Sequence, residues 1–225
     1  MIRDAGGKRA AKKADPHASK LYRELVPAYE ALWPMVARNR IRSVIRGMKF
    51  LPGQKVLEVG VGTGMSLTAY PHDIDLTGVD LSEDMLAQAQ KLMDDEKLSH
   101  IRVMPMNAEH LEFEDCGFDI VTSFHVISVV SDPRRMMSEM LRVCKPGGQL
   151  LLINHFRSKN PWIAKMVGAA GAVTRHLGWR TDLSLDEVVE EMPIRVERRY
   201  KSSPASLFTI IKATKLDSVE PRPAD

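Results

Sequence analysis

Residues 56–64 read VLEVGVGTG, an apolar strand that runs directly into a loop with glycine at every second position. A strand, a glycine turn and a following helix make a ligand site at the carboxyl edge of a sheet. Glycine at Gly60, Gly62 and Gly64 lets the main chain turn sharply and lets a ligand approach it without meeting a Cβ atom. The spacing differs from Gly-x-Gly-x-x-Gly, and the loop has no Lys-Ser/Thr pair of the kind found in nucleoside triphosphate sites.

Short apolar strands alternate with helical stretches from Lys55 onward, which predicts an α/β fold with a mostly parallel sheet covered by helices on both faces. The expected strands are residues 55–59, 75–80, 101–106, 118–124 and 149–154. The expected helices are residues 83–93 after the cap Ser82, residues 134–143 after Pro133, and residues 185–192. Residues 195–200 and 207–213 follow one another without a helix, so they should pair antiparallel as a C-terminal hairpin and complete seven strands.

The composition is that of an ordinary globular protein. Of 225 residues, 44% are hydrophobic and 27% are charged, which excludes disordered, collagen-like and coiled-coil chains. No apolar run approaches the ~18 residues of a spanning helix, and the N-terminus is charged where a signal peptide needs apolar residues, so we expect a cytoplasmic protein. Cys116 and Cys144 share no metal-ligand or Cys-x-x-Cys spacing, which favours reduced core thiols and no metal site.

Positive charge is concentrated at the beginning of the chain. Residues 1–50 contain 12 Lys/Arg against 4 Asp/Glu, whereas the remaining residues contain 20 against 25. We therefore expect a basic head on a mildly acidic body. We also expect the protein to be a monomer. Four parts are predicted: a basic flexible tail (1–19), amphipathic lid or membrane-binding helices (20–49), the domain with the glycine loop (50–215) and a C-terminal tail (216–225).

Polar groups at successive strand ends narrow the choice of ligand. Glu58 beside the loop repels phosphates and attracts cationic groups, and Asp80 can accept hydrogen bonds from both hydroxyls of a ribose. Asn107 can hydrogen-bond an adenine edge, whose faces Leu81 and Met85 can cover. S-adenosylmethionine has an ammonium, a sulfonium and no phosphate, so this set of residues predicts it as the cofactor.

Several motifs, in this order, resemble those of class I S-adenosylmethionine-dependent methyltransferases: LEVGVGTG (57–64), GVDLSEDML (78–86), NAE (107–109), FDIV (118–121) and KPGG (145–148). A narrower set is similar to bacterial phospholipid N-methyltransferases: residues 129–133, 153–156, 177–180 and 206–209. The resemblance implies a Rossmann-like methyltransferase fold, cofactor contacts from Ala108 and Glu109, and S-adenosylhomocysteine as the product. It also implies methylation of phosphatidylethanolamine and its partly methylated products.

An aromatic and apolar stripe lies in the basic head. Its members recur at spacings near three and four, as in a helix that lies in a membrane interface: Leu21, Tyr22, Leu25, Val26, Tyr29, Leu32, Trp33 and Val36. Of these, the expected membrane contacts are Leu21, Tyr22, Leu25 and Trp33. The stripe could instead pack over the sheet as a lid, and one segment could do both. Three cations further along are candidate partners for a lipid phosphate: Arg157, Lys159 and Arg180. No nucleic-acid recognition module is visible, so no nucleic-acid partner is expected.

Methyl transfer from a sulfonium needs alignment, desolvation and a neutral amine. An ethanolamine ammonium must first lose its proton, which makes Tyr29, His125 and His155 candidates for orienting the amine or accepting the proton. His125 follows the fourth strand and should lie close to the sulfonium. We expect methylation of phosphatidylethanolamine towards phosphatidylcholine by an enzyme held peripherally on the inner face of an anionic membrane. The alternatives are an O- or C-methyltransferase for a small or prenylated molecule, and a non-catalytic membrane-associated cofactor-binding protein.

Overall fold

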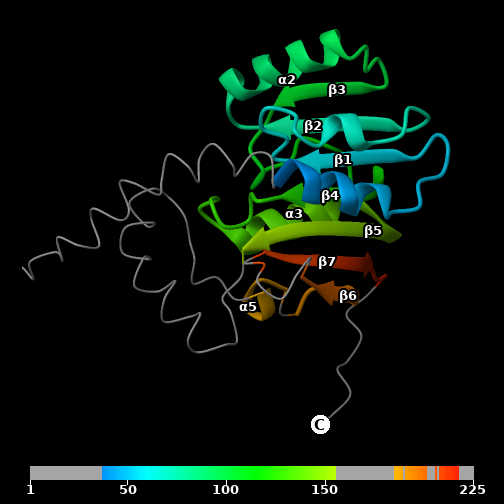
Figure 1. Ribbon diagram of the computed structural model, residues 1–225. Coiled ribbons are helices and arrows are strands. Elements are labelled where there is room, and N and C mark those ends of the chain that lie inside the picture. The colour runs from blue at the N-terminus through cyan, green and yellow to red at the C-terminus, as the bar shows by residue number, and fades with distance from the viewer. Residues whose placement is uncertain (1–36, 156–184, 190, 202–205, 207, 218–225) are drawn as a thin grey trace, which may run out of the picture. The chain divides into compact units, whose positions relative to one another are not determined.

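The computed structural model describes residues 37–155, 185–189, 191–201, 206 and 208–217 (Figure 1). The chain divides into two units, Met1–Asn39 and Arg40–Asp225, and the sheet lies entirely in the second. Among the described residues, no helix is both long and apolar enough to cross a membrane. The predicted tail (1–19), most of the predicted lid and residues 218–225 lie outside the described residues, so the predicted division into four parts stays a prediction.

A seven-stranded sheet carries the fold, with the strand order β3-β2-β1-β4-β5-β7-β6 (Figure 1). Its parallel strands are β1 (Lys55–Val59), β2 (Asp75–Asp80), β3 (Ile101–Pro105), β4 (Phe118–Phe124) and β5 (Cys144–His155). The antiparallel strands are β6 (Ile194–Tyr200) and β7 (Phe208–Lys215). The predicted fold class is confirmed, and the principal shift in bounds is that β5 begins at Cys144 and not at Gln149.

The helical elements are residues 37–46, η1 (Leu67–Ala69), α2 (Glu83–Asp95), α3 (Pro133–Val143) and α5 (Leu185–Val189). Helices α2 and α3 and the 3-10 turn η1 connect neighbouring parallel strands in the chain, whereas a loop without a helix joins β3 to β4. Ser82 caps α2 as predicted, because its side chain accepts a hydrogen bond from the Met85 N–H. The predicted helix over 185–192 is shorter in the structure, since Glu191 has φ of 62°, which a right-handed helix does not accommodate.

The last strand in sequence lies inside the sheet and the one before it lies at the edge. β7 pairs with both β5 and β6, and its first four residues are buried. β6 reads IRVERRY, and its central residues are all exposed. The apolar run thus occupies the inner position, and the charged strand protects the edge against pairing with another chain.

The main core lies between the sheet and α3. Three methionines of α3, Met136, Met137 and Met140, are fully buried against side chains of the central strands, among them Leu57 and Val121. Alternate residues of β1 point to opposite faces of the sheet, so Glu58 lies on the face away from Leu57. Figure 1 shows α3 and the helical residues 40–46 on opposite sides of the sheet.

The prediction for the two cysteines is half right. Cys144 is buried, and burial raises the pKa of its thiol to about 12, whereas Cys116 is exposed. Cys116 lies in the turn before β4 with φ of 55°, and its N–H donates to the Arg142 carbonyl. The apolar context in the sequence predicted a buried thiol. The turn instead directs the Cys116 side chain towards solvent.

Candidate active site

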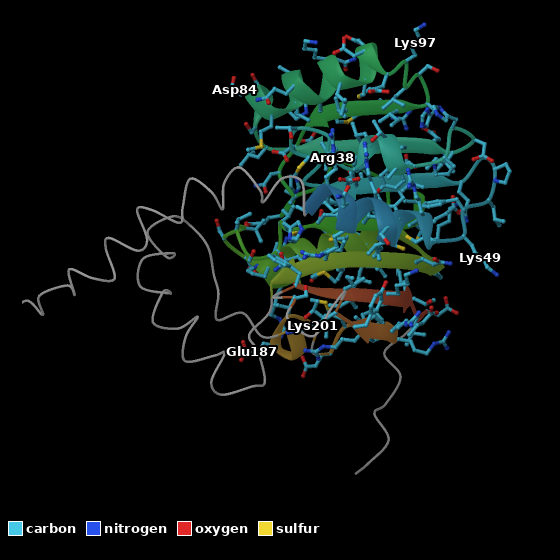
Figure 2. All side chains as sticks on the ribbon, in the orientation of Figure 1. Arg38, Lys49, Asp84, Lys97, Glu187 and Lys201 are labelled. Atoms are coloured by element: carbon cyan, nitrogen blue, oxygen red, sulfur yellow. The ribbon has the colours of Figure 1, made fainter. Side chains whose placement is uncertain are left out.

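The parallel strands all end at one edge of the sheet, and the predicted cofactor residues follow them there. β1 lies between β2 and β4. From β1 the chain first adds β2 and β3 on one side, and it then crosses to add β4 and β5 on the other side. This arrangement is the topological switch point at which open α/β sheets bind ligands. Asp84, labelled in Figure 2, marks this edge, whereas Lys97, beyond the far end of α2, marks the opposite one.

The glycine loop after β1 is held against β2. The N–H groups of Gly60 and Val61 both donate to the Val79 carbonyl, at 2.7 and 3.0 Å. A Cβ atom at Gly60 would lie 2.1 Å from Val126 Cγ2, so packing alone requires glycine there. At Gly62, among the described residues, a Cβ atom would meet only Met85 Sδ at 3.8 Å. Gly62 therefore presents main chain to open space, where a ligand can approach it.

Asp80 ends β2 and orients this loop. Its Oδ2 accepts a hydrogen bond from the Gly62 N–H at 2.8 Å, and its Oδ1 accepts one from the Ser82 N–H at 3.0 Å. Each carboxylate oxygen can accept a further hydrogen bond. Asp80 thus anchors the loop while keeping the capacity for the predicted contacts to a ribose, which stay a prediction.

Glu58 lies in a buried hydrogen-bonded network behind the loop. It is 2% exposed, and its two oxygens accept hydrogen bonds from Ser66 Oγ at 2.6 Å and Tyr70 Oη at 2.8 Å. Tyr70 Oη also lies 2.9 Å from Thr122 Oγ1 of β4. Burial raises the pKa of Glu58 to about 7 despite the two hydrogen bonds, which lower it. The network fastens the segment after the loop to β1 and β4, and direct attraction of a cationic ligand by Glu58 stays a prediction.

Glu58→Gln is expected to weaken the pH dependence of stability of the unliganded protein. A carboxyl with a pKa of 4.5 unfolded and about 7 folded keeps its proton only in the folded state over that interval, so stability falls as the pH rises. The fall should be roughly 1–3 kcal/mol between about pH 5 and pH 8, and the amide of the variant removes this contribution. Urea unfolding of both proteins across this range measures the difference, and parallel pH profiles would contradict a protonated Glu58.

Two residues after β3 have different roles: Asn107 exposes an amide, and Glu109 holds neighbouring segments in place. Asn107 is exposed, and its Oδ1 accepts a hydrogen bond from the Glu109 N–H at 2.9 Å, which leaves its amide nitrogen able to donate to an adenine edge. Glu109 holds the start of α3, because its Oε1 accepts from the Asp132 N–H at 2.9 Å and its carbonyl accepts from Arg135 Nε. Cofactor contacts from Asn107, Ala108 and Glu109 stay predictions.

Two apolar side chains next to Asp80 are exposed at this edge. Leu81 is 75% exposed and Met85 is 45% exposed. Burial of side chains of this size is worth about 1.5–3 kcal/mol each, so a planar apolar group that covers them would gain free energy. The open main chain at Gly62, the carboxylate of Asp80 and these two side chains together fit the predicted cofactor, S-adenosylmethionine.

His125 lies directly after β4 in a strained conformation. Its φ is 66°, which is uncommon for a residue with a Cβ atom, and its N–H donates to the Ile153 carbonyl of β5 at 2.7 Å. Its ring packs edge-on against Phe208, with centroids 4.7 Å apart. Burial, aided by the nearby charge of Arg40, lowers the pKa of His125 to about 4, so its imidazole is neutral at neutral pH. Backbone strain of this kind clusters at functional sites.

Other predicted site residues lie outside the described residues: Leu21, Tyr22, Leu25, Tyr29, Trp33, Arg157, Lys159 and Arg180. His155 ends β5 opposite Phe208, at the edge where His125 lies, and its side chain is outside the described part of the chain. The predicted catalytic, phosphate-binding and membrane-binding roles of these residues stay predictions.

Ser66 and Tyr70 complete the site, and the sequence patterns did not point to them. A buried acid needs hydrogen-bond donors, so the available signal was a serine and a tyrosine within twelve residues after Glu58. Arg142 was missed as well. Its guanidinium donates to Glu139 and to the Leu111 carbonyl, and these bonds hold the loop after β3 against α3.

Comparisons with known proteins agree with this geometry. The methyltransferase domain family matches residues 57–152. A phosphatidylethanolamine N-methyltransferase of Cereibacter sphaeroides is 39% identical over 162 residues, which cover 71% of this chain and 79% of the relative. A demethylmenaquinone methyltransferase of Renibacterium salmoninarum is 30% identical over 145 residues, which cover 62% of this chain and 59% of the relative. The crystal structure of the YcgJ protein from Bacillus subtilis superposes with a TM-score of 0.66 at 18% identity, covering 79% of this chain and 98% of that one.

The fold is that of a Rossmann-like methyltransferase, and the carboxyl edge of the sheet is the candidate cofactor site. The chain belongs to the S-adenosylmethionine-dependent methyltransferases, and the predicted family, enzyme class and cofactor are confirmed. The alternative of a cofactor-binding protein without catalysis is thereby set aside.

Proposed function

We propose that the enzyme methylates the amine of phosphatidylethanolamine and of its mono- and dimethyl derivatives, towards phosphatidylcholine. The observation that carries this proposal is the 39% identity to the phosphatidylethanolamine N-methyltransferase over 79% of that relative. The quinone-methylating relative supports the rival acceptor class, a prenylated ring methylated on carbon, but it is less identical and is matched over a shorter share of its length.

The bound cofactor supplies a methyl group that is already activated, so the protein has to position the acceptor and keep its amine neutral. His125 suits the positioning task because a neutral imidazole can accept a hydrogen bond from an amine N–H. Its low pKa makes it a poor store for the proton that the ammonium loses. We therefore assign His125 to orientation of the amine, together with Tyr29 and His155 as further candidates for contact with it.

The proposed place of reaction is the inner surface of an anionic membrane. The first 50 residues carry 12 Lys/Arg against 4 Asp/Glu, and each such cation near an anionic surface contributes about 1 kcal/mol to binding. Leu21, Tyr22, Leu25 and Trp33 are the proposed apolar anchors in this segment. Lipid phosphates are the proposed partners of Arg157, Lys159 and Arg180. We propose a monomer with no nucleic-acid partner.

Purified protein with labelled S-adenosylmethionine and phosphatidylethanolamine in mixed anionic vesicles is expected to yield labelled mono-, di- and trimethylated lipid. Turnover should rise with pH through the neutral range, because the fraction of neutral amine rises while His125 does not titrate there. Mass spectrometry of the extracted lipids measures the products. Demethylmenaquinone in matched vesicles is the control acceptor, and label in the quinone alone would replace the proposed acceptor by the rival one.

A further inference from the structure

A cation lies over an aromatic ring, and an imidazole packs edge-on against the same ring, beside the proposed amine site; we call Arg40, Phe208 and His125 the cation–aromatic stack. The guanidinium of Arg40, in the helical residues 37–46, lies over the Phe208 ring with its Cζ 4.8 Å from the centroid. His125 also contacts Phe208, and its ring stands edge-on with centroids 4.7 Å apart and an interplanar angle of 87°. Phe208 begins β7 opposite His155, so this cation–aromatic stack lies where β4 and β5 end.

The stack and the glycine loop give opposite charges to two parts of the same edge. The carboxylate of Asp80 lies against the loop after β1, on the side that suits a cofactor with ammonium and sulfonium groups. Arg40 lies beyond β4, close enough to His125 for its positive charge to lower the pKa of the imidazole. A cationic cofactor gains nothing from Arg40, so this charge suits an anion on the acceptor.

We propose that Arg40 binds the phosphate of a phosphoethanolamine group and thereby sets that group's amine beside His125. This inference rests on the proposed function, because it concerns the acceptor of the same reaction. In phosphoethanolamine, only an ester oxygen and two methylene groups separate the phosphate from the amine. The phosphate and the amine are therefore close enough to bind at two neighbouring side chains, Arg40 and His125. A quinone has no such anion.

Arginine suits this task better than lysine. A guanidinium can lie over an aromatic ring, as that of Arg40 lies over Phe208, while the N–H groups at its edge make paired hydrogen bonds to phosphate oxygens. The same chemistry is present in a lipid headgroup and in free phosphoethanolamine. The assay therefore uses two acceptors, phosphatidylethanolamine in neutral vesicles and free phosphoethanolamine, and the one that the wild type methylates identifies the source.

The test compares Arg40→Gln with Arg46→Gln, an arginine that lies exposed in the same helix. Arg40→Gln should raise the KM for the methylated acceptor roughly 10- to 100-fold, as expected for loss of a charge-assisted hydrogen bond. Its affinity for S-adenosylhomocysteine, measured by calorimetry, should stay within about twofold, which also shows that the variant is folded. Arg46→Gln should leave both quantities near the wild-type values, because the neutral vesicles of this assay give the Arg46 charge no anionic surface to bind. Arg40→Lys keeps the charge and should recover part of the loss.

Two results would overturn the assignment while the proposed function stands. One is a wild type that methylates phosphatidylethanolamine, with an unchanged KM in Arg40→Gln. The other is an equal rise in KM for Arg46→Gln, which would mean that the positive charge of this helix attracts the acceptor at a distance and that Arg40 makes no specific phosphate contact. Failure of the proposed function looks different, because the wild type itself would then leave phosphatidylethanolamine unmethylated. If it methylated free phosphoethanolamine instead, the role of Arg40 would be tested on that acceptor, and if it methylated neither, the role of Arg40 would fall as well.

Discussion

Replacing Gly62 by valine is expected to abolish binding of S-adenosylmethionine while the protein stays folded. In the folded chain a Cβ atom at this position would meet only Met85 Sδ, at 3.8 Å, among the described residues, so the added methyl groups do not disrupt the core. They would occupy the open side of the loop, where we predict that the cofactor approaches the main chain. Affinity should fall at least about 100-fold, a loss of roughly 3 kcal/mol or more. Calorimetric titration measures it, and unchanged affinity would refute the role of the loop.

Gly53→Val is the matched control for this variant. Gly53 has φ of 76°, compared with 54° at Gly62, so valine is strained at both positions, by on the order of 1–3 kcal/mol. Gly53 lies before β1, at the opposite edge of the sheet. Both variants should therefore lose a similar amount of thermal stability, and only Gly62→Val should lose cofactor binding. Gly60→Val is unsuitable because its side chain would collide with Val126.

Asp80→Ala is expected to weaken cofactor affinity by roughly 1–3 kcal/mol, or about 5- to 150-fold. The change removes the predicted contacts to the ribose and also the hydrogen bond from the Gly62 N–H at 2.8 Å, which orients the loop. Asp80→Asn keeps one acceptor oxygen and should lie between the wild type and the alanine variant. Calorimetry with S-adenosylhomocysteine measures all three affinities.

Asp84→Ala controls for the loss of negative charge near the site. Asp84 lies in the first turn of α2, four residues after Asp80, and its side chain is exposed (Figure 2). The variant should bind the cofactor with wild-type affinity. Equal weakening in Asp80→Ala and Asp84→Ala would mean that Asp80 acts through its charge at a distance and that the ribose is held by other groups.

Much of the fold could be predicted from the sequence, because neighbouring residues determine it. The alternation of short apolar strands with helices predicted the parallel strands, and the confirmed bounds of β1, β2 and β4 match the prediction. Ser82 as a cap and the glycine loop are likewise local signals, since a cap or a turn involves residues a few positions apart. In the parallel part of the sheet, all strands end at one edge, so the approximate positions of Asp80, Asn107 and His125 followed from the same pattern.

The tertiary structure decided what each of these side chains touches. The sequence predicted that Glu58 is a charge facing the ligand. In the structure Ser66 and Tyr70 enclose its carboxyl group, because the segment with η1 folds back over β1. Cys116 read as a core thiol, yet its turn exposes it. The stack of Arg40, Phe208 and His125 joins residues far apart in the chain. The sequence by itself determined the strands, the glycine loop and the cofactor class through short-range patterns. Only the folded chain decided these pairings, because they depend on how distant segments pack.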